Sequence, residues 1–507
     1  MKIRRRLLPL LTLLAATAAA GVASGAAENV NAIARPNIIL ILADDLGYGD
    51  VQALNPSRGK IATPHLDRLS REGMTFTDAH SGSSVCTPTR YGLLTGRYAW
   101  RTHLQEGVYD GYPEPLIAAD RLTVGHLLQR QGYHTAVIGK WHLGFTVQGG
   151  EAAPTVPVSG GAKAAKKSGA APRGAITANG PLTRGFDRYR GFQHARSMEA
   201  YFENDRVAAT VTPIDMLPTI TRHAVEHVGE RAATGQPFFL YFALSSPHSP
   251  IAPAKDWQGK SGLNAYADFT MQTDHAVGEV LAAVEKAGIA RNTVILFASD
   301  NGCSPVADTP ALEARGHFAS AQFRGYKADI WEGGHRVPLI VRWPDRIRAG
   351  SRSETTLCLG DFVATAADLS GAKLPANAAE DSFSFRPDLL GTGRSARTGV
   401  VHHSINGRFA IREGPWKLIF CAGSGGWSKP TDVDAQKESL AAVQLYNLDA
   451  DPGEQDNLAA RRPEIVQRLT TLIEDTVARG RSTPGPTQRN DATVVIAKVA
   501  APVAPKK

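Results

Sequence analysis

Four strongly apolar runs, each followed by polar and turn residues, dominate the larger part of this chain. They are Asn37–Ala43, Thr135–Ile138, Phe238–Leu244 and Thr293–Ala298. Continuous apolar runs are typical of strands covered on both faces, and segments with helical periodicity, such as Arg121–Gln131 and Asp268–Ala287, lie between them. The alternation predicts an α/β fold with a mostly parallel sheet sandwiched by helices, over residues 28–373.

The pattern changes after about Lys373. Short strand candidates follow at Arg408–Arg412, Trp416–Phe420 and Leu445–Leu448, and a helical stretch runs from Pro463 to Arg479. This order predicts a smaller C-terminal α+β domain, residues 374–480, built on an antiparallel sheet. Residues 481–507 contain Pro, Ala and Lys with little periodicity, so we expect a disordered tail.

The N-terminus has the composition of a secretory signal peptide. Four basic residues among the first six precede an apolar run from Leu7 to Ala20, and small residues follow to Ala27. The alternative, a membrane anchor, is disfavoured because the apolar core is shorter than the ~20 residues of a spanning helix. We therefore expect residues 1–27 to be removed, leaving an exported protein, periplasmic or secreted, with no membrane span.

Removing residues 1–27 takes away four cations and no acids, which lowers the formal net charge from +8 to +4. Most of the remainder lies in an insert rich in Gly, Ala, Ser and Pro, at about residues 147–182. The folded body is then nearly neutral, which argues against a nucleic-acid partner. We interpret the insert as a solvated loop; attraction to a sulfated polymer is the alternative.

Polar clusters follow the four apolar runs. They are Asp44-Asp45, the segment with Lys140 and His142, the segment with His248, and Asp300-Asn301. Ligands bind beyond the carboxyl ends of strands in open parallel sheets, so we expect these clusters to share one rim. The oxygen ligands of Asp44, Asp45, Asp300 and Asn301 suit Ca²⁺ or Mg²⁺. The chain has no HExxH or paired-cysteine motif, which disfavours zinc.

The segment CTPTRYGLLTGR, from Cys86 to Arg97, resembles the signature of the type I, formylglycine-dependent sulfatases. The resemblance is to enzymes such as arylsulfatase A and N-acetylgalactosamine-6-sulfatase, in the alkaline phosphatase superfamily. It extends from RPNIILILADDLGYGD, Arg35–Asp50, to LYNLDADPGEQDNLA, Leu445–Ala459. The family fold, similar to alkaline phosphatase, agrees with the α/β prediction.

The resemblance implies that Cys86 is oxidised by a formylglycine-generating or sulfatase-maturating enzyme to Cα-formylglycine, whose hydrate is the nucleophile. A serine would become a sulfoserine and would need a second hydrolysis, whereas a geminal diol expels sulfate as its hemiacetal collapses. The family also implies one Ca²⁺ per chain, held by Asp44, Asp45, Asp300 and Asn301, with residue 86 as a further ligand.

Other roles are carried over position by position. The second lysine motif of the family resembles FRGYKADIWEGGHRVP, which contains Lys327. The resemblance implies that Arg90 holds the diol, Lys140 and Lys327 bind sulfate, His142 takes the proton of hemiacetal collapse, and His248 binds sulfate or protonates the leaving alcohol.

Two features bear on the substrate pocket. Tyr326, Ala328 and Asp329 replace smaller residues that are common around the second lysine of the family. Further candidate substrate contacts are Arg101 and His103, just after the nucleophile segment, and His335.

These patterns predict an exported, calcium-dependent sulfatase, and we favour sulfated carbohydrates over small aryl sulfates as substrates. A phosphonate or phosphate monoester hydrolase of the same superfamily is an alternative. An inactive sulfated-glycan-binding protein is a third, disfavoured because the nucleophile and all ligands are present. Conversion of Cys86 leaves Cys303, Cys358 and Cys421, whose pairing the sequence leaves open.

Overall fold

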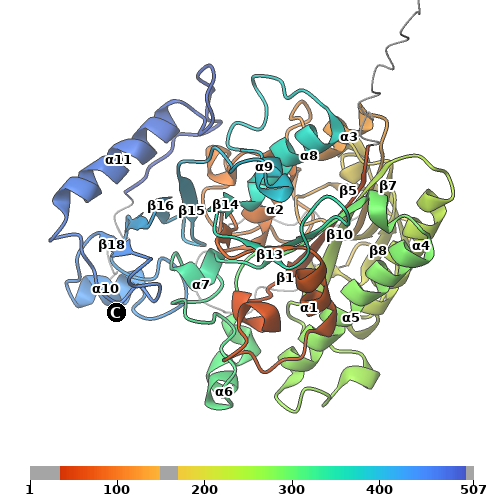
Figure 1. Ribbon diagram of the computed structural model, residues 1–507, viewed down its shortest axis with the longest axis horizontal. Helices are drawn as coiled ribbons and strands as arrows, with labels where there is room; N and C mark the ends of the chain where they lie inside the picture. Colours follow the sequence, from red (N-terminus) through yellow and green to blue (C-terminus); the bar gives the residue numbers. More distant parts are fainter. Residues whose placement is uncertain (1–34, 149–169, 498–507) are drawn as a thin grey trace, which may run out of the picture. The chain divides into compact units, whose positions relative to one another are not determined.

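The computed structural model describes residues 35–148 and 170–497, shown in Figure 1. The predicted signal peptide, most of the predicted insert and the last ten residues lie outside this part. The larger sheet of the described chain has twelve strands, in the order β13 (Ser351–Ser353), β2 (Met74–Phe76), β12 (Leu339–Arg342), β11 (Thr293–Ser299), β1 (Asn37–Asp44), β10 (Phe238–Pro247), β4 (His134–Lys140), β7 (Arg188–Phe192), β8 (Ala200–Glu203), β9 (Arg206–Thr210), β6 (Ile176–Thr177) and β5 (Val147–Gln148).

The centre of this sheet is parallel. Strand β1 runs parallel to β10 and β11, with Leu40 opposite Tyr241 on one side and Leu296 on the other, and β4 and β7 continue in the same direction. Strands β12 and β8 reverse the direction on the two flanks. The α/β class is confirmed, and the sheet as a whole is mixed.

Helices cover both faces of the large sheet because successive side chains of a buried strand point to opposite sides. In β1, Ile38, Leu40 and Leu42 share a core with α2 (Cys86–Thr95), α3 (Val124–Gln129) and α8 (Phe362–Ser370). Ile39 and Ile41 share a second core with α1 (Pro64–Glu72), α4 (Pro213–Ala232) and α5 (Ala265–Lys286). The helices predicted near residues 121–131 and 268–287 are α3 and α5.

The C-terminal region contains a separate four-stranded antiparallel sheet. Its order is β15 (Val400–His403), β16 (Phe409–Glu413), β17 (Trp416–Ile419) and β18 (Gln444–Asn447). Helix α11 (Pro463–Ala478) lies beside this sheet in Figure 1 and shares a hydrophobic core with it through Leu469 and Ile473. The short elements β3 (Ala79–His80), β14 (Leu357–Cys358), α6 (Thr309–Ala314), α7 (Glu332–His335), α9 (Arg386–Leu390) and α10 (Asp432–Lys437) complete the described structure.

The prediction of a disordered tail is wrong for residues 481–497. Asp491 pairs with Arg97 at 3.0 Å, and its N–H donates to the carbonyl of Arg101 at 2.7 Å. Asn490 accepts a hydrogen bond from Arg101 at 2.8 Å. The segment has little hydrophobic periodicity, but buried arginines of the main body hold its polar groups in place.

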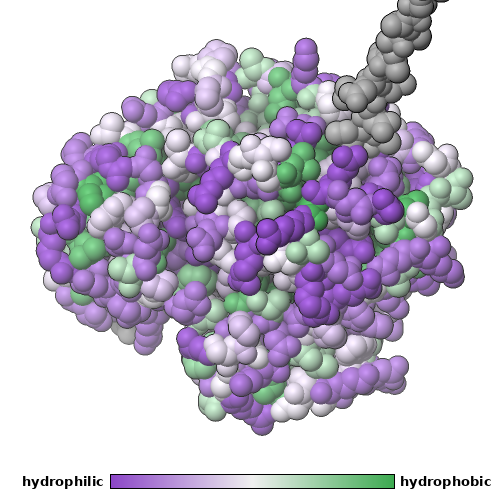
Figure 2. All heavy atoms as spheres, in the orientation of Figure 1, coloured by the Kyte–Doolittle hydropathy of each residue, from purple (hydrophilic) through white to green (hydrophobic). Residues whose placement is uncertain are grey.

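The surface and the thiols add two findings. All four cysteines are buried and unpaired, so Cys303, Cys358 and Cys421 form no disulfide among themselves. The face in Figure 2 is mainly hydrophilic, with hydrophobic residues in small separate groups. Among the described residues, no helix has both the length and the apolar character needed to cross a membrane.

Candidate active site

Cys86 begins helix α2 at the rim formed by the carboxyl ends of the parallel strands. The residue before it, Val85, provides no side-chain cap, so the first N–H groups of the helix lack a capping side-chain acceptor. This end of a helix favours negative charge. Burial raises the pKa of the Cys86 thiol, while Lys140 and Lys327 act in the opposite direction. The thiol is therefore a buried group that is subject to the charges of two ammonium groups.

Arg90 lies one turn further along α2 and joins two strand ends. Its Nε and Nη2 donate to Asp300 Oδ2 at 3.0 and 2.8 Å, and its Nη1 donates to the carbonyl of Lys140 at 3.1 Å. The guanidinium is fully buried, so this two-point contact fixes it in position. Arg90 thus holds the nucleophile helix against β11 and β4.

Two lysines meet two adjacent carboxylates at the end of β1. Lys140 Nζ lies 2.7 Å from Asp44 Oδ2, and Lys327 Nζ lies 2.6 Å from Asp45 Oδ1. Asn301 donates through Nδ2 to Asp45 Oδ1 at 2.8 Å. The polar clusters after β1, β4 and β11 therefore meet at one rim, as the strand pattern predicts.

The oxygen atoms of this rim fit a hard cation. Asp44 Oδ1 and Asn301 Oδ1 are buried and have no hydrogen-bond partner in the described chain. Burial, followed by the neighbouring Asp44 carboxylate, raises the pKa of Asp300 to about 7. A bound cation would satisfy the unpartnered oxygens and offset the repulsion between carboxylates. Because the donors are oxygens, Ca²⁺ suits this set better than zinc.

Three residues of the rim have the left-handed backbone that disfavours side chains with a Cβ. Asp45 has φ of 67°, His142 of 60° and Ala328, next to Lys327, of 82°. Each such conformation costs on the order of 1–3 kcal/mol and persists only where the surroundings enforce it. The clustering of strain at one rim is typical of a functional site.

His142 is oriented as a base. Its Nε2 lies 2.8 Å from the carbonyl oxygen of Tyr109, and since a carbonyl only accepts, Nε2 carries the hydrogen. Nδ1 then carries the lone pair, is buried and has no partner in the described chain. Burial, with the charge of Lys140, holds the pKa of His142 well below its usual range. The ring is therefore neutral near pH 7 and ready to accept a proton.

His248 lies at the open side of the rim, with 12% of its side chain exposed. Its Nδ1 donates to the carbonyl of Ser249 at 2.5 Å, which leaves Nε2 facing Asp45 Oδ2 at 3.7 Å. Burial lowers the pKa of His248 to about 4, and Lys327 acts in the same direction. His248 therefore accepts through Nε2 when neutral and donates through it only after gaining a proton.

The structure does not bring Arg101 or His335 to this rim. Arg101 is fully buried and pairs with Asp381 at 2.7 Å, between the nucleophile segment and the C-terminal region. His335 is fully buried and stacks on His402 with ring centroids 3.8 Å apart. Both side chains are held in other buried contacts, and a substrate contact for either one stays a prediction.

His103 is the remaining candidate contact. Its side chain is exposed, and its Nε2 lies 2.7 Å from the hydroxyl oxygen of Tyr109, the residue whose carbonyl orients His142. A role in substrate binding for His103 stays a prediction.

Two further residues beside the site were not predicted. Tyr109 orients His142, and His194 places its ring 4.4 Å from that of His142. His194 follows β7, the strand next to β4, so the rule that ligands bind at strand ends provides a signal for it. Tyr109 acts through its backbone, which no side-chain pattern reveals.

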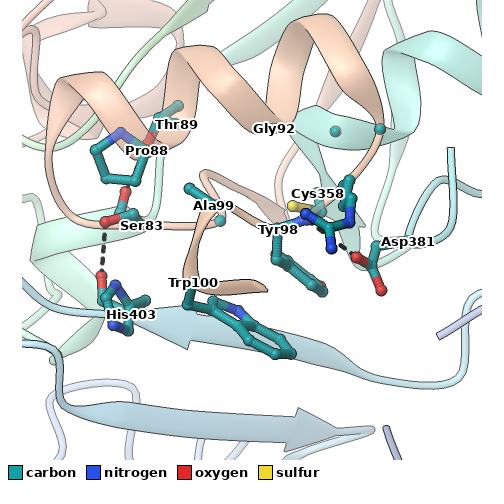
Figure 3. Close-up of a pocket in the computed structure, with 14 residues that line it drawn as sticks. Ser83, Pro88, Thr89, Gly92, Tyr98, Ala99, Trp100, Cys358, Asp381 and His403 are labelled. Atoms are coloured by element: carbon teal, nitrogen blue, oxygen red, sulfur yellow. Dashed lines mark hydrogen bonds between the residues drawn. The ribbon is translucent and has the colours of Figure 1, made fainter. Parts of the chain in front are cut away.

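A small cavity lies on another side of α2, between that helix and the C-terminal sheet (Figure 3). Its volume is about 10 Å³, room for a single water. Ser83 donates across it to the carbonyl of His403 at 2.8 Å. The hydrogen bond from Ser83 links the segment before α2 to β15. The cavity itself is too small for a substrate.

The fold and the rim of paired lysines and carboxylates define an α/β enzyme of the ester-hydrolase class. A family model described as Sulfatase matches residues 36–372, and the chain belongs to this family of enzymes that hydrolyse sulfate esters.

Similar proteins align with most of this chain. An N-acetylgalactosamine-6-O-sulfatase of Bacteroides thetaiotaomicron is 32% identical, over 88% of this chain and 94% of the relative. Human arylsulfatase A is also 32% identical, over 87% of this chain and 88% of the relative. A solved sulfatase structure, from work on glycosaminoglycan metabolism by Bacteroides thetaiotaomicron, is 28% identical with a TM-score of 0.74, over 87% of this chain and 99% of that one.

Proposed function

We propose that this protein is an exported sulfatase that removes sulfate monoesters from carbohydrates, with residue 86 as nucleophile and a Ca²⁺ ion at the rim. The observation that carries the proposal is the convergence at one rim of Lys140 and Lys327, each paired with a carboxylate at the end of β1, and of helix α2, which begins at Cys86 and is tied to Asp300 by Arg90. The catalytic region is assigned to residues 28–373 and the C-terminal subdomain to 374–480.

The charges of the rim support binding of a sulfate group. Three carboxylates, Asp44, Asp45 and Asp300, face the three cations Arg90, Lys140 and Lys327. This balance leaves the divalent charge of a calcium ion to attract the single negative charge of a sulfate monoester. Lys140 and Lys327 provide compact ammonium groups for sulfate oxygens, where charge increases as the ester bond breaks.

Calcium, held by Asp44, Asp45, Asp300 and Asn301, would draw charge from the sulfate oxygens. Conversion of Cys86 to formylglycine would supply a hydrated aldehyde, which can accept the sulfate group and later release it. Arg90 orients the start of α2 through Asp300, so residue 86 keeps one position relative to the rim.

The two histidines divide the proton transfers. His142 has an unprotonated, unpartnered Nδ1 and takes the proton whose removal frees the enzyme. His248 lies at the exposed side, where the alcohol leaves, and contacts sulfate or protonates the departing oxygen. The carbohydrate substrate is supported by the name of the Bacteroides relative and by the glycosaminoglycan setting of the solved structure.

The test is sulfate release by protein purified from a host that converts cysteine to formylglycine. Substrates are N-acetylgalactosamine 6-sulfate, 4-nitrophenyl sulfate and 4-nitrophenyl phosphate. We expect kcat/KM to be highest for the sulfated sugar and lowest for the phosphate ester. Faster turnover of the phosphate ester would favour the phosphatase alternative, and binding without turnover of any ester would favour the glycan-binding one.

A further inference from the structure

The strand and loop segments of the C-terminal region reach the rim of the site. The N–H of Gly107 donates to the carbonyl of Ile405 at 2.7 Å, and the N–H of Ile405 donates to the carbonyl of Ala328 at 3.2 Å. The N–H of Ala328 in turn donates to the carbonyl of Ser84, two residues before the nucleophile, at 2.9 Å. A chain of backbone contacts thus links the C-terminal region to both Cys86 and Lys327.

Asp329 extends this contact to the segment Ser424–Ser428. Its Oδ1 accepts the N–H of Trp427 at 2.9 Å and that of Ser428 at 3.0 Å, and the hydroxyl of Ser428 donates to its other oxygen. Asp329 is fully buried and is one of the residues that depart from the family's second lysine motif. Its role in the fold is to fix the backbone of residue 427 beside the lysine segment.

Gly426 allows the backbone of the segment Ser424–Ser428 to lie very close to the backbone of Ala328 and Asp329. A Cβ at this position would lie 2.4 Å from the carbonyl oxygen of Ala328 and 2.7 Å from the N of Asp329. Only glycine lets the two backbones touch here. The backbone of Trp427 is therefore held in place by Asp329, which lies two residues along the chain from Lys327.

Trp427 is the residue of this support that stays partly exposed to solvent. Its side chain is 40% exposed, and the other six tryptophans are buried or half-buried. No aromatic or cationic side chain of the described residues contacts its ring, and its indole N–H has no partner there. A large aromatic ring held rigidly in water loses little entropy when it binds a partner.

We propose that Trp427 is a stacking platform for a sugar ring of the substrate, next to the sulfate-binding rim. The apolar C–H face of a pyranose covers an aromatic ring well, and the sugar hydroxyls remain in water. The inference rests on the proposed function and goes further, because it assigns a carbohydrate contact outside the sulfate site. A small aryl sulfate held by its sulfate at Lys140 and Lys327 gains little from this platform.

The kinetic test compares Trp427→Ala with Trp427→Phe and with Val433→Ala, a nearby residue that is 41% exposed. Substrates are a disaccharide carrying N-acetylgalactosamine 6-sulfate and 4-nitrophenyl sulfate. We expect Trp427→Ala to raise KM for the disaccharide about three- to tenfold, with kcat and the aryl sulfate KM within twofold. Trp427→Phe and Val433→Ala should resemble the wild type. An unchanged disaccharide KM, or an equal rise for both substrates, would overturn the inference.

A binding measurement separates this inference from failure of the proposed function. In the Cys86→Ala background, acrylamide quenches mainly the exposed Trp427, and the sulfated disaccharide should protect it from quenching. The protection should disappear in the Cys86→Ala, Trp427→Phe double variant. Absence of protection at a disaccharide concentration that binds would contradict the platform, whether or not the wild type hydrolyses any sulfate ester.

Discussion

Two groups of side chains in the described chain contain residues that commonly bind metals, and they differ in their access to solvent. The rim group includes Asp44, Asp45 and His248, whose ligand atoms all lie within 4.8 Å of one another. The histidine group consists of His80, Glu332, His335 and His402, gathered equally closely. Residue type and proximity alone do not distinguish the two.

The rim group retains unmet demand for a cation. Although Lys140 and Lys327 pair with its carboxylates, Asp44 Oδ1 and Asn301 Oδ1 have no hydrogen-bond partner in the described chain. The side chain of His248 is 12% exposed, so the group has an open side. Its donors and its access both suit an exchangeable ligand.

The histidine group is supplied with cations by the protein itself. Lys417 Nζ lies 3.1 Å from Glu332 Oε1, 2.8 Å from Glu454 Oε1 and 3.0 Å from His335 Nε2. Arg412 contacts His80 Nε2 at 3.1 Å, and the four members of the group are fully buried. Both groups contain buried ammonium groups and atoms without a hydrogen-bond partner, so what sets the rim apart is its set of oxygen donors and its open side at His248, which suit an exchangeable metal better than a fully buried network does.

Replacing the nucleophile should have the largest effect. We expect Cys86→Ala to lower kcat at least about 10³-fold on every sulfate ester, because no other side chain of the rim supplies a comparable nucleophile. Sulfate release and a melting curve measure activity and folding together. Cys421→Ala, which removes another buried thiol, should retain activity; equal losses in the two variants would contradict the assignment.

Removing the base should have the next largest effect. We expect His142→Asn to lower kcat by about 10²–10⁴-fold. In the wild type His142 must be neutral to accept a proton. Because burial holds the pKa of His142 well below 6.5, its ring should stay neutral when the pH is lowered from 8 to 6.5. A pH profile of kcat/KM should thus show its acid limb below pH 6.5. An acid limb near pH 7 that persists in His142→Asn would contradict the role.

Breaking the histidine group should affect folding alone. Lys417→Met leaves Glu332 and Glu454 buried without their ammonium partner, at a cost of about 3–5 kcal/mol of unfolding free energy. Urea unfolding measures this, with the exposed Lys437→Met as control, expected within about 0.5 kcal/mol of the wild type. The comparison fails if the two variants are equally stable.

Calcium should stabilise the folded protein by binding at the rim and not at the histidine group. After chelation, Ca²⁺ at one hundred times its Kd should add about 2.7 kcal/mol of stability. The melting temperature should rise in the wild type and in Lys417→Met but not in Asn301→Ala. A calcium-dependent rise that survives Asn301→Ala and disappears in Lys417→Met would reverse the assignment of the two groups.

The sequence predicts the parts of the fold that depend on local pattern. The buried strands are continuous apolar runs, and β1, β4, β10 and β11 contain the predicted segments. The rim follows from the same pattern, because polar residues at the ends of parallel strands must converge.

The sequence does not reveal which buried partner a charged side chain takes. Arg90 and Arg101 lie in the same stretch, yet Arg90 pairs with Asp300 in the site and Arg101 pairs with Asp381, 280 residues away. His335 is buried by residues of the C-terminal sheet in the same manner. Long-range pairing also accounts for the ordered segment 481–497, whose polar groups bind Arg97 and Arg101.

The most direct test of the central claim is the mass of the peptide that contains Cys86, from protein exported by its native host. The account predicts the mass of formylglycine, or of its hydrate, at position 86 in active protein. An unmodified thiol at this position in protein that releases sulfate at full rate would contradict the account.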